Sequence, residues 1–132
     1  MYYFSMPRPN HFAIPAEDPH RAQEFYRHVF NWKFELAWEY DTPTGREGYW
    51  RASTGSGSES GIDGGITKRE YPGQPIAVGI QVPSVEEYAA RVEKYGGKII
   101  VGRMQLPDGT FFAFCQDSEG NSFAIVESAA SA

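Results

Sequence analysis

The chain has 132 residues, a formal net charge of −5 from 12 Lys and Arg against 17 Asp and Glu, and aromatic side chains at 15% of its positions. This length favours a single domain, 1–132, or two very small halves that share a core. The absence of a basic run excludes a nucleic-acid groove, no apolar run is long enough to span a membrane, and Cys115 as the only cysteine excludes an intrachain disulfide.

The composition also indicates a compartment. A lone cysteine fits a reducing environment, and residues 1–10 lack the basic and apolar regions of a signal peptide. We therefore expect a cytoplasmic protein with no nucleic-acid or membrane partner.

Residues 11–34 predict a strand, a helix and the start of a second strand. Asp18 followed by Pro19 is a typical helix N-terminus, and Asn31 is a plausible end. Apolar residues at positions i, i+3, i+4, i+7 and i+8 predict one buried stripe, formed by Ala22, Phe25, Tyr26, Val29 and Phe30.

Three strands complete the first half of the chain. Residues 32–39 alternate apolar and mostly polar side chains, which indicates a half-buried strand, and residues 48–52 and 62–67 form two shorter strands. The last of these contains Gly64 and Gly65, which mark a bulge or a close backbone approach.

The second half repeats this plan after a polar linker. Residues 76–82 predict a strand, Ser84 and Glu87 form a capping box at the start of a helix, and Gly96 and Gly97 end that helix. Strands follow from residue 98, at 111–116 and at 122–127. The predicted fold class is therefore α+β with two βαβββ modules, module one at about 10–67 and module two at about 76–127.

Side-chain alternation assigns a face to each strand residue. Bulky apolar residues face the helix, and the smaller ones face away, if the final hairpin pairs Asp117 with Ser122. The face turned away from the helices would then carry His11, Ala13, Ala77, Gly79, Gln81, Ala113, Cys115, Ser122 and Ala124. Such small side chains indicate a ligand cavity, or close packing against another sheet or a partner chain.

The segments AEDPHRAQEFYRHVFNWKF, VPSVEEYAARVEKYGGK and DSEGNSF resemble the vicinal oxygen chelate superfamily. This superfamily includes glyoxalase I, extradiol dioxygenases and bleomycin-resistance proteins, and the resemblance is greatest to the group related to lactoylglutathione lyase. It covers about residues 10–127. It implies paired modules that curl around a cavity, a small-molecule ligand and a homodimer, but it is a poor guide to the reaction.

The resemblance also implies four metal-ligand positions, two in each module. They fall on His11, Ala77, Ala124 and Gly65, or on Gly64 with a one-residue slip. Only the imidazole is a metal ligand, and protein metal sites generally need two or three ligands. We therefore predict no metal and no cofactor at this site.

His11 is the candidate catalytic residue, as a general base or hydrogen-bond donor, although a structural role is equally plausible. Cys115 is a nucleophile only beside an activating group, and a buried cysteine is more often a small hydrophobe. One or two of Trp32, Trp38, Tyr49, Trp50 and Phe111 are expected to stack on a planar ligand. The predicted ligand-binding residues are His11, Ala77, Gln81, Phe111, Cys115 and Ala124.

Two functions are compatible with these features. The first, which we favour, is a metal-independent protein that binds an aromatic or amphipathic small molecule. The second is a glyoxalase-related lyase or isomerase with His11 as the base or as the sole family-type metal ligand.

Overall fold

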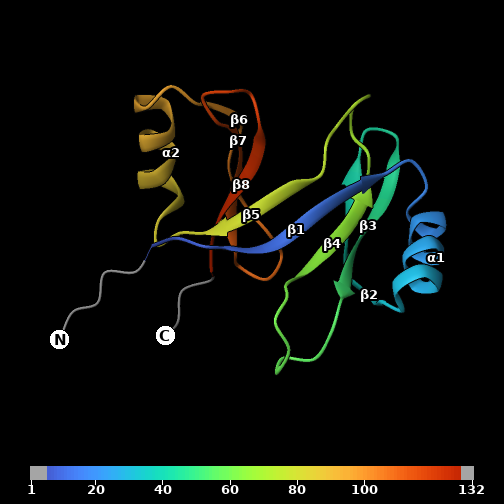
Figure 1. The fold of residues 1–132 in the computed structure, drawn as a ribbon. Helices are drawn as coiled ribbons and strands as arrows, with labels where there is room; N and C mark the ends of the chain where they lie inside the picture. The colour runs from blue at the N-terminus through green and yellow to red at the C-terminus, as the bar shows by residue number, and fades with distance from the viewer. Residues whose placement is uncertain (1–5, 129–132) are drawn as a thin grey trace. The chain divides into compact units, whose positions relative to one another are not determined.

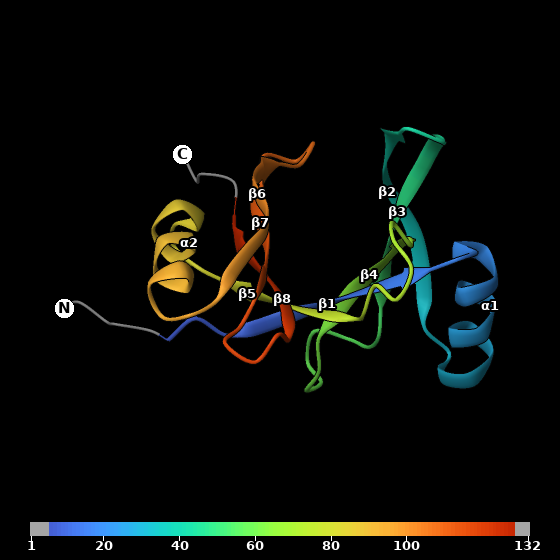
Figure 2. The same cartoon turned by 90° about the horizontal axis from the view of Figure 1, so that it is seen from above.

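The computed structural model describes residues 6–128 and contains two compact units. One unit comprises His11–Ala77, and the other runs from Val78 onward together with the segment before His11. Each contains one βαβββ module, so the predicted α+β class and its duplicated arrangement are confirmed. Figures 1 and 2 show one helix beside the sheet of each module.

Module one is a four-stranded sheet in the order β2-β3-β4-β1. Strands β1 and β4 run parallel, and β2, β3 and β4 are antiparallel neighbours. The five elements are β1 (Pro9–Ala16), α1 (Pro19–Phe30), β2 (Lys33–Thr42), β3 (Gly45–Ser53) and β4 (Asp63–Lys68).

Helix α1 has the predicted ends. The Asp18 carboxylate accepts a hydrogen bond from the Arg21 backbone N–H at 3.1 Å, and Pro19 occupies the first turn. Asn31 ends the helix with a φ of 63°, in the left-handed region. A short polar cap and a left-handed Asn satisfy backbone groups that would otherwise lack partners at each end.

The predicted apolar stripe of α1 is only partly buried. Ala22 and Tyr26 pack over the sheet, whereas Phe25, Val29 and Phe30 are 57%, 53% and 56% exposed. The stripe is wider than the surface that one sheet face covers, so the sheet meets only one edge of it. Beside that edge lies Gln23, which is 4% exposed and whose Nε2 has no hydrogen-bond partner among the described residues.

Module two has the strand order β5-β8-β7-β6, with β5 and β8 parallel. The Ser84 hydroxyl accepts from the Glu87 N–H at 3.1 Å, which confirms Ser84 as the helix cap but forms only one half of the predicted capping box. The Glu87 carboxylate pairs with Arg91 at 3.2 Å, and the Val85 N–H donates to Glu127 at 2.9 Å. The elements are β5 (Ala77–Gln81), α2 (Val85–Lys94), β6 (Lys98–Gln105), β7 (Phe111–Gln116) and β8 (Ser122–Glu127).

The predicted register of the last hairpin is wrong by one residue, because Ser122 pairs with Gln116 and not with Asp117. The Asp117 N–H donates to the Asn121 carbonyl at 2.9 Å, and its carboxylate accepts from the Asn121 N–H at 2.9 Å. A further bond from the Glu119 N–H, at 2.8 Å, closes the turn. These bonds place Asp117 opposite Asn121, and a one-residue slip moves every side chain of the strand to the other face.

Gln23→Met should stabilise the protein, because it replaces the unpartnered buried amide with an apolar side chain of similar length. We expect the free energy of unfolding to rise by about 1 kcal/mol, measured by urea unfolding. Gln105→Met is the matched control at an exposed strand position, and it should change stability by less than about 0.5 kcal/mol. A loss of stability in Gln23→Met would contradict the assignment of an unsatisfied amide.

Candidate functional site

Each sheet has one face under its helix and a second face turned away from it, here called the distal face. In β1, Phe12 and Ile14 pack under α1, which places His11 and Ala13 on the distal face. Ala13 pairs with Gly65 of β4. The structure therefore brings together two residues that the resemblance implies as metal positions, His11 and Gly65, on the distal face of module one.

A tyrosine occupies the space above Gly65. A Cβ atom built on Gly65 would lie 2.3 Å from the hydroxyl oxygen of Tyr49 and 2.4 Å from its Cζ. Tyr49 is on the distal face because its neighbour Trp50 packs into the cluster under α1. A close approach of this kind is a reason for a glycine inside a strand, so of the two predicted meanings of the glycine pair the close approach fits, although at Gly65 the approaching group is a side chain.

The Tyr49 ring is held by a second aromatic ring. Trp38 of β2 stacks on it with ring centroids 4.5 Å apart and planes 7° from parallel. Tyr40 lies two residues further along the same face of β2. Burial raises the pKa of Tyr40, and the Glu70 and Glu47 carboxylates add to this rise. The distal face of module one is thus an aromatic surface at the end formed by β2 and β3.

Charged and polar groups border this aromatic surface. Arg51 pairs with Gly65 across β3 and β4, and its guanidinium binds the Glu35 carboxylate at 3.0 Å. Burial lowers the pKa of His11 below its usual value of 6.5. This shift favours the neutral form of the imidazole at pH 7.

The distal face of module two is also partly apolar. Gly79 pairs with Ala124, and both are buried. Because β7 pairs with β8 one residue away from the predicted register, Phe112 and Phe114 lie on this face. Their rings meet edge to face, with centroids 5.3 Å apart. The Gln81 amide donates to the Ser128 hydroxyl at 2.8 Å.

The register correction removes two predicted ligand-binding residues from the distal face. Phe111 and Cys115 pack in the core cluster of α2 with Val85 and Ile125. Ala113, which was also expected on the distal face, is buried in the same cluster. Cys115 is 1% exposed, and burial raises the pKa of its thiol to about 11. Its interpretation as a small hydrophobe is the one that fits.

The four implied metal positions do not fit a divalent ion. His11 supplies an imidazole, but Gly65, Ala77 and Ala124 supply no side-chain ligand. The space above Gly65 is filled by the Tyr49 ring. Within residues 6–128, no group of three or more His, Cys, Asp or Glu side chains lies close enough together to hold a metal ion.

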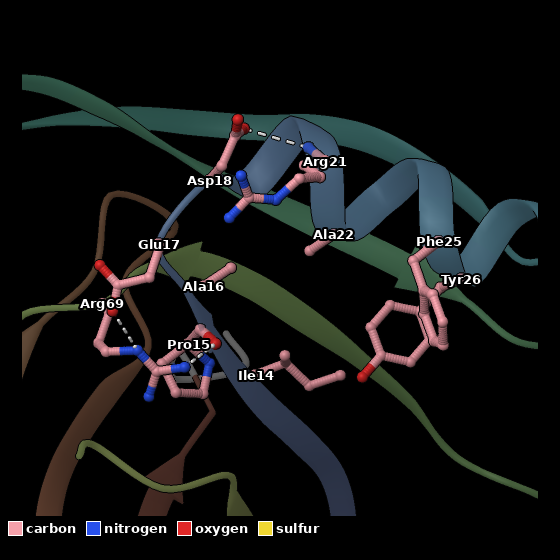
Figure 3. Close-up of a pocket in the computed structure, with 10 residues that line it drawn as sticks. All are labelled: Ile14, Pro15, Ala16, Glu17, Asp18, Arg21, Ala22, Phe25, Tyr26 and Arg69. Carbon is pink, nitrogen blue, oxygen red and sulfur yellow. Dashed lines mark hydrogen bonds and ion pairs between the residues drawn. The ribbon is translucent and has the colours of Figure 1, made fainter. Parts of the chain in front are cut away.

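A separate shallow groove of about 440 Å³ lies on the helix side of module one (Figure 3). Arg69 closes one end through an ion pair to Glu17 at 2.8 Å and a bond to the Pro15 carbonyl at 3.3 Å. The rings of Phe25 and Tyr26 form the other end. Because the guanidinium of Arg69 is used to join the segment after β4 to β1, we interpret this end of the groove as structural.

Sequence reasoning missed part of this site. Trp38 and Tyr49 belong to the five aromatic residues predicted to stack on a ligand, whereas the predicted register places Phe112 and Phe114 under the helix. The bonding capacity of Asp117 within its turn was the signal available for finding them. In residues 6–128, no helix is long and apolar enough for a membrane span, and the expectation of no signal peptide falls partly on residues outside this range.

Comparisons with known proteins agree on one family. Residues 8–125 match the model of the Glyoxalase/Bleomycin resistance protein/Dioxygenase superfamily. A glyoxylase-like domain-containing protein of Didymella fabae is 32% identical over 114 residues, covering 85% of this chain and 87% of that protein.

Two solved structures share the fold at lower identity. The methylmalonyl-CoA epimerase of Mycobacterium tuberculosis has a TM-score of 0.67 at 15% identity and covers 98% of this chain and 94% of its own. A Streptomyces coelicolor methylmalonyl-CoA epimerase variant with 2-nitronate-propionyl-CoA has a TM-score of 0.64 at 18% identity, with 96% and 97% covered. At these identities the likeness shows the fold alone.

His11 should titrate below pH 6.5, because burial disfavours the imidazolium. The folded pKa is then lower than the unfolded one, so the stability contributed by the neutral ring is present above pH 6.5 and is lost as the pH falls through the folded pKa. NMR titration of the imidazole, assigned with His11→Asn, measures this directly. A His11 pKa at or above 6.5 would contradict the buried environment.

Cys115 should be unreactive in the folded protein, because a thiol with a pKa of about 11 forms little thiolate at pH 8. We expect iodoacetamide to label it only in urea, as measured by mass spectrometry. Ser53→Cys, at a partly exposed strand end, is the positive control. Rapid labelling of native Cys115 would restore it as a distal-face candidate.

Proposed function

Because the chain belongs to the Glyoxalase/Bleomycin resistance protein/Dioxygenase superfamily, we propose that it is a small-molecule binding protein that holds a planar aromatic ligand without a family metal. The observation that carries this proposal is the parallel Trp38–Tyr49 ring pair on the distal face of module one, at 4.5 Å. Aromatic rings offer a large apolar contact area and favour offset stacking with a further ring.

The other groups on this face suit an aromatic ligand that carries a polar substituent. Burial favours the neutral imidazole of His11, and the Arg51 guanidinium, paired with Glu35, adds a cation to the same face. Ligand sites typically combine an apolar lining with a few such polar groups. The distal face of module two, with Phe112 and Phe114, offers a second apolar surface of the same character.

Metal-assisted chemistry has little support in these residues. A vicinal-oxygen chelate needs a divalent ion held by several ligands, and the implied positions offer one imidazole and three residues with no donor. We therefore assign no step of the function to a metal. Ala77, Gln81 and Ala124 remain proposed ligand contacts. We also retain three proposals that follow from the sequence: a homodimer, a single domain and a cytoplasmic location.

Nitrobenzene is a suitable probe, because it is planar and quenches tryptophan fluorescence on contact. We expect saturable quenching of the wild type at pH 7, with binding heat measured by calorimetry. Trp38→Leu should lower the affinity for nitrobenzene at least about tenfold, because it deletes the stacked ring. Trp32→Leu is the matched control, since Trp32 stacks on Tyr26 under α1. No saturable binding, or equal effects of both variants, would overturn the proposal.

The second candidate is a lyase or isomerase with His11 as the base. Its support is the lowered pKa of His11, which favours the neutral imidazole that a base needs, and the presence of epimerases among the proteins that share the fold. The test is turnover of the glutathione–methylglyoxal hemithioacetal, of a vicinal diol and of methylmalonyl-CoA, each with and without Zn²⁺, Ni²⁺ or Mn²⁺. Turnover that His11→Ala abolishes would favour the enzyme, and binding without turnover would favour the binding protein.

A further inference from the structure

The groove on the helix side of module one is a binding site separate from the distal face (Figure 3). We propose that it takes an amphipathic carboxylate, a small molecule whose ionised carboxyl group pairs with Arg21 and whose apolar body lies beside α1. Every residue that lines the groove belongs to module one. The inference is therefore independent of the function proposed for the distal face.

The middle and one end of the groove are apolar. Its volume of about 440 Å³ lies within the range of small-molecule sites. Ile14 and Ala16 of β1 line it together with Ala22 of α1. Phe25, at the end away from Arg69, is 57% exposed, so its ring is available to a ligand. An apolar group placed here would remove such surface from water, which favours binding.

The other end carries a cation that has no partner of opposite charge. The Arg21 side chain is exposed, and its guanidinium forms no ion pair or hydrogen bond with any residue that the structure describes. The hydrogen bond from the Arg21 backbone N–H, and to a smaller extent the charge of its side chain, lower the pKa of Asp18. A guanidinium offers N–H donors in a planar fork that matches both oxygens of a carboxylate.

The two acidic residues at this end already have partners. The Glu17 carboxylate pairs with Arg69 at 2.8 Å. The Asp18 carboxylate accepts from the Arg21 backbone N–H at 3.1 Å as the helix cap, and Figure 3 shows it turned away from Ile14. A ligand cation would have to compete with Arg69 for Glu17. The charge still available to a ligand is thus that of the Arg21 guanidinium, which favours an anion.

The spacing along α1 sets the size of the ligand. Arg21 and Phe25 are four residues apart, which is about one helical turn, or roughly 6 Å along the axis. A carboxyl group joined to a ring by a short carbon chain spans a comparable distance. The class that fits is therefore short-chain carboxylates that carry an aromatic or branched apolar group.

The acid 3-phenylpropionate tests this proposal at pH 7, with 3-phenylpropanol as the neutral analogue of similar shape. Binding is followed by the ¹H–¹⁵N NMR shifts of the backbone amides. We expect saturable shifts at Ala22 and Phe25 with a Kd on the order of 1 mM, because a shallow groove leaves a small ligand partly in water. The alcohol should bind at least about fivefold more weakly, since it lacks the charge-assisted pair.

Two pairs of variants separate the charge from the apolar contact. Arg21→Gln should weaken 3-phenylpropionate about fivefold and the alcohol by less than about twofold. Arg27→Gln is its matched control, because Arg27 pairs with Glu24 on the same helix and does not line the groove. Phe25→Ala should weaken both probes about threefold. Val29→Ala, at a similarly exposed position outside the groove, should weaken neither.

Several results would overturn the proposal. One is the absence of saturable shifts in α1, and another is equal binding of the acid and the alcohol. Equal effects of Arg21→Gln and Arg27→Gln, or tighter binding of 3-phenylpropylamine than of the acid, would remove the role of the guanidinium. Shifts at Trp38 and Tyr49 in place of those in α1 would put the probe on the distal face, which overturns this site and supports the proposed function.

Discussion

Module one depends on two consecutive glycines that allow close approach on both faces of β4. A Cβ on Gly64 would meet the Phe12 ring at 2.4 Å, and a Cβ on Gly65 would meet the Tyr49 hydroxyl at 2.3 Å. Because β4 lies between β3 and β1, these contacts reach both neighbouring strands. The Phe12 side completes the core under α1, and the Tyr49 side builds the aromatic surface.

Local patterns were sufficient to predict most of the fold. Caps such as Asp18 and Ser84 act within three residues, so their hydrogen bonds follow from the sequence alone. The glycine pair was also readable as a close backbone approach, although nothing local indicated that Tyr49 would be the partner. That contact joins residues of different strands, and a single sequence does not rank the possible pairings.

The two errors have different sources, one within a turn and one in packing between elements. The register of the last hairpin turned on the hydrogen bonds of Asp117, and one shifted residue exchanged Cys115 for Phe114 on the distal face. Likewise, the width of the apolar stripe on α1 gave no indication of which edge the sheet would cover. Phe25 is consequently exposed, while Gln23 is buried.

The placement of Tyr49 over Gly65 also bears on how this chain could change over evolutionary time. A new side chain at residue 65 is compatible with the structure only if the tyrosine ring moves away first, and loss of that ring alone removes one half of the aromatic pair. The two positions are therefore coupled, because each limits which side chain the other can hold. A ligating side chain at residue 65 would therefore need a smaller residue at position 49 as well, so an ordinary packing contact limits which chemistry this strand can acquire.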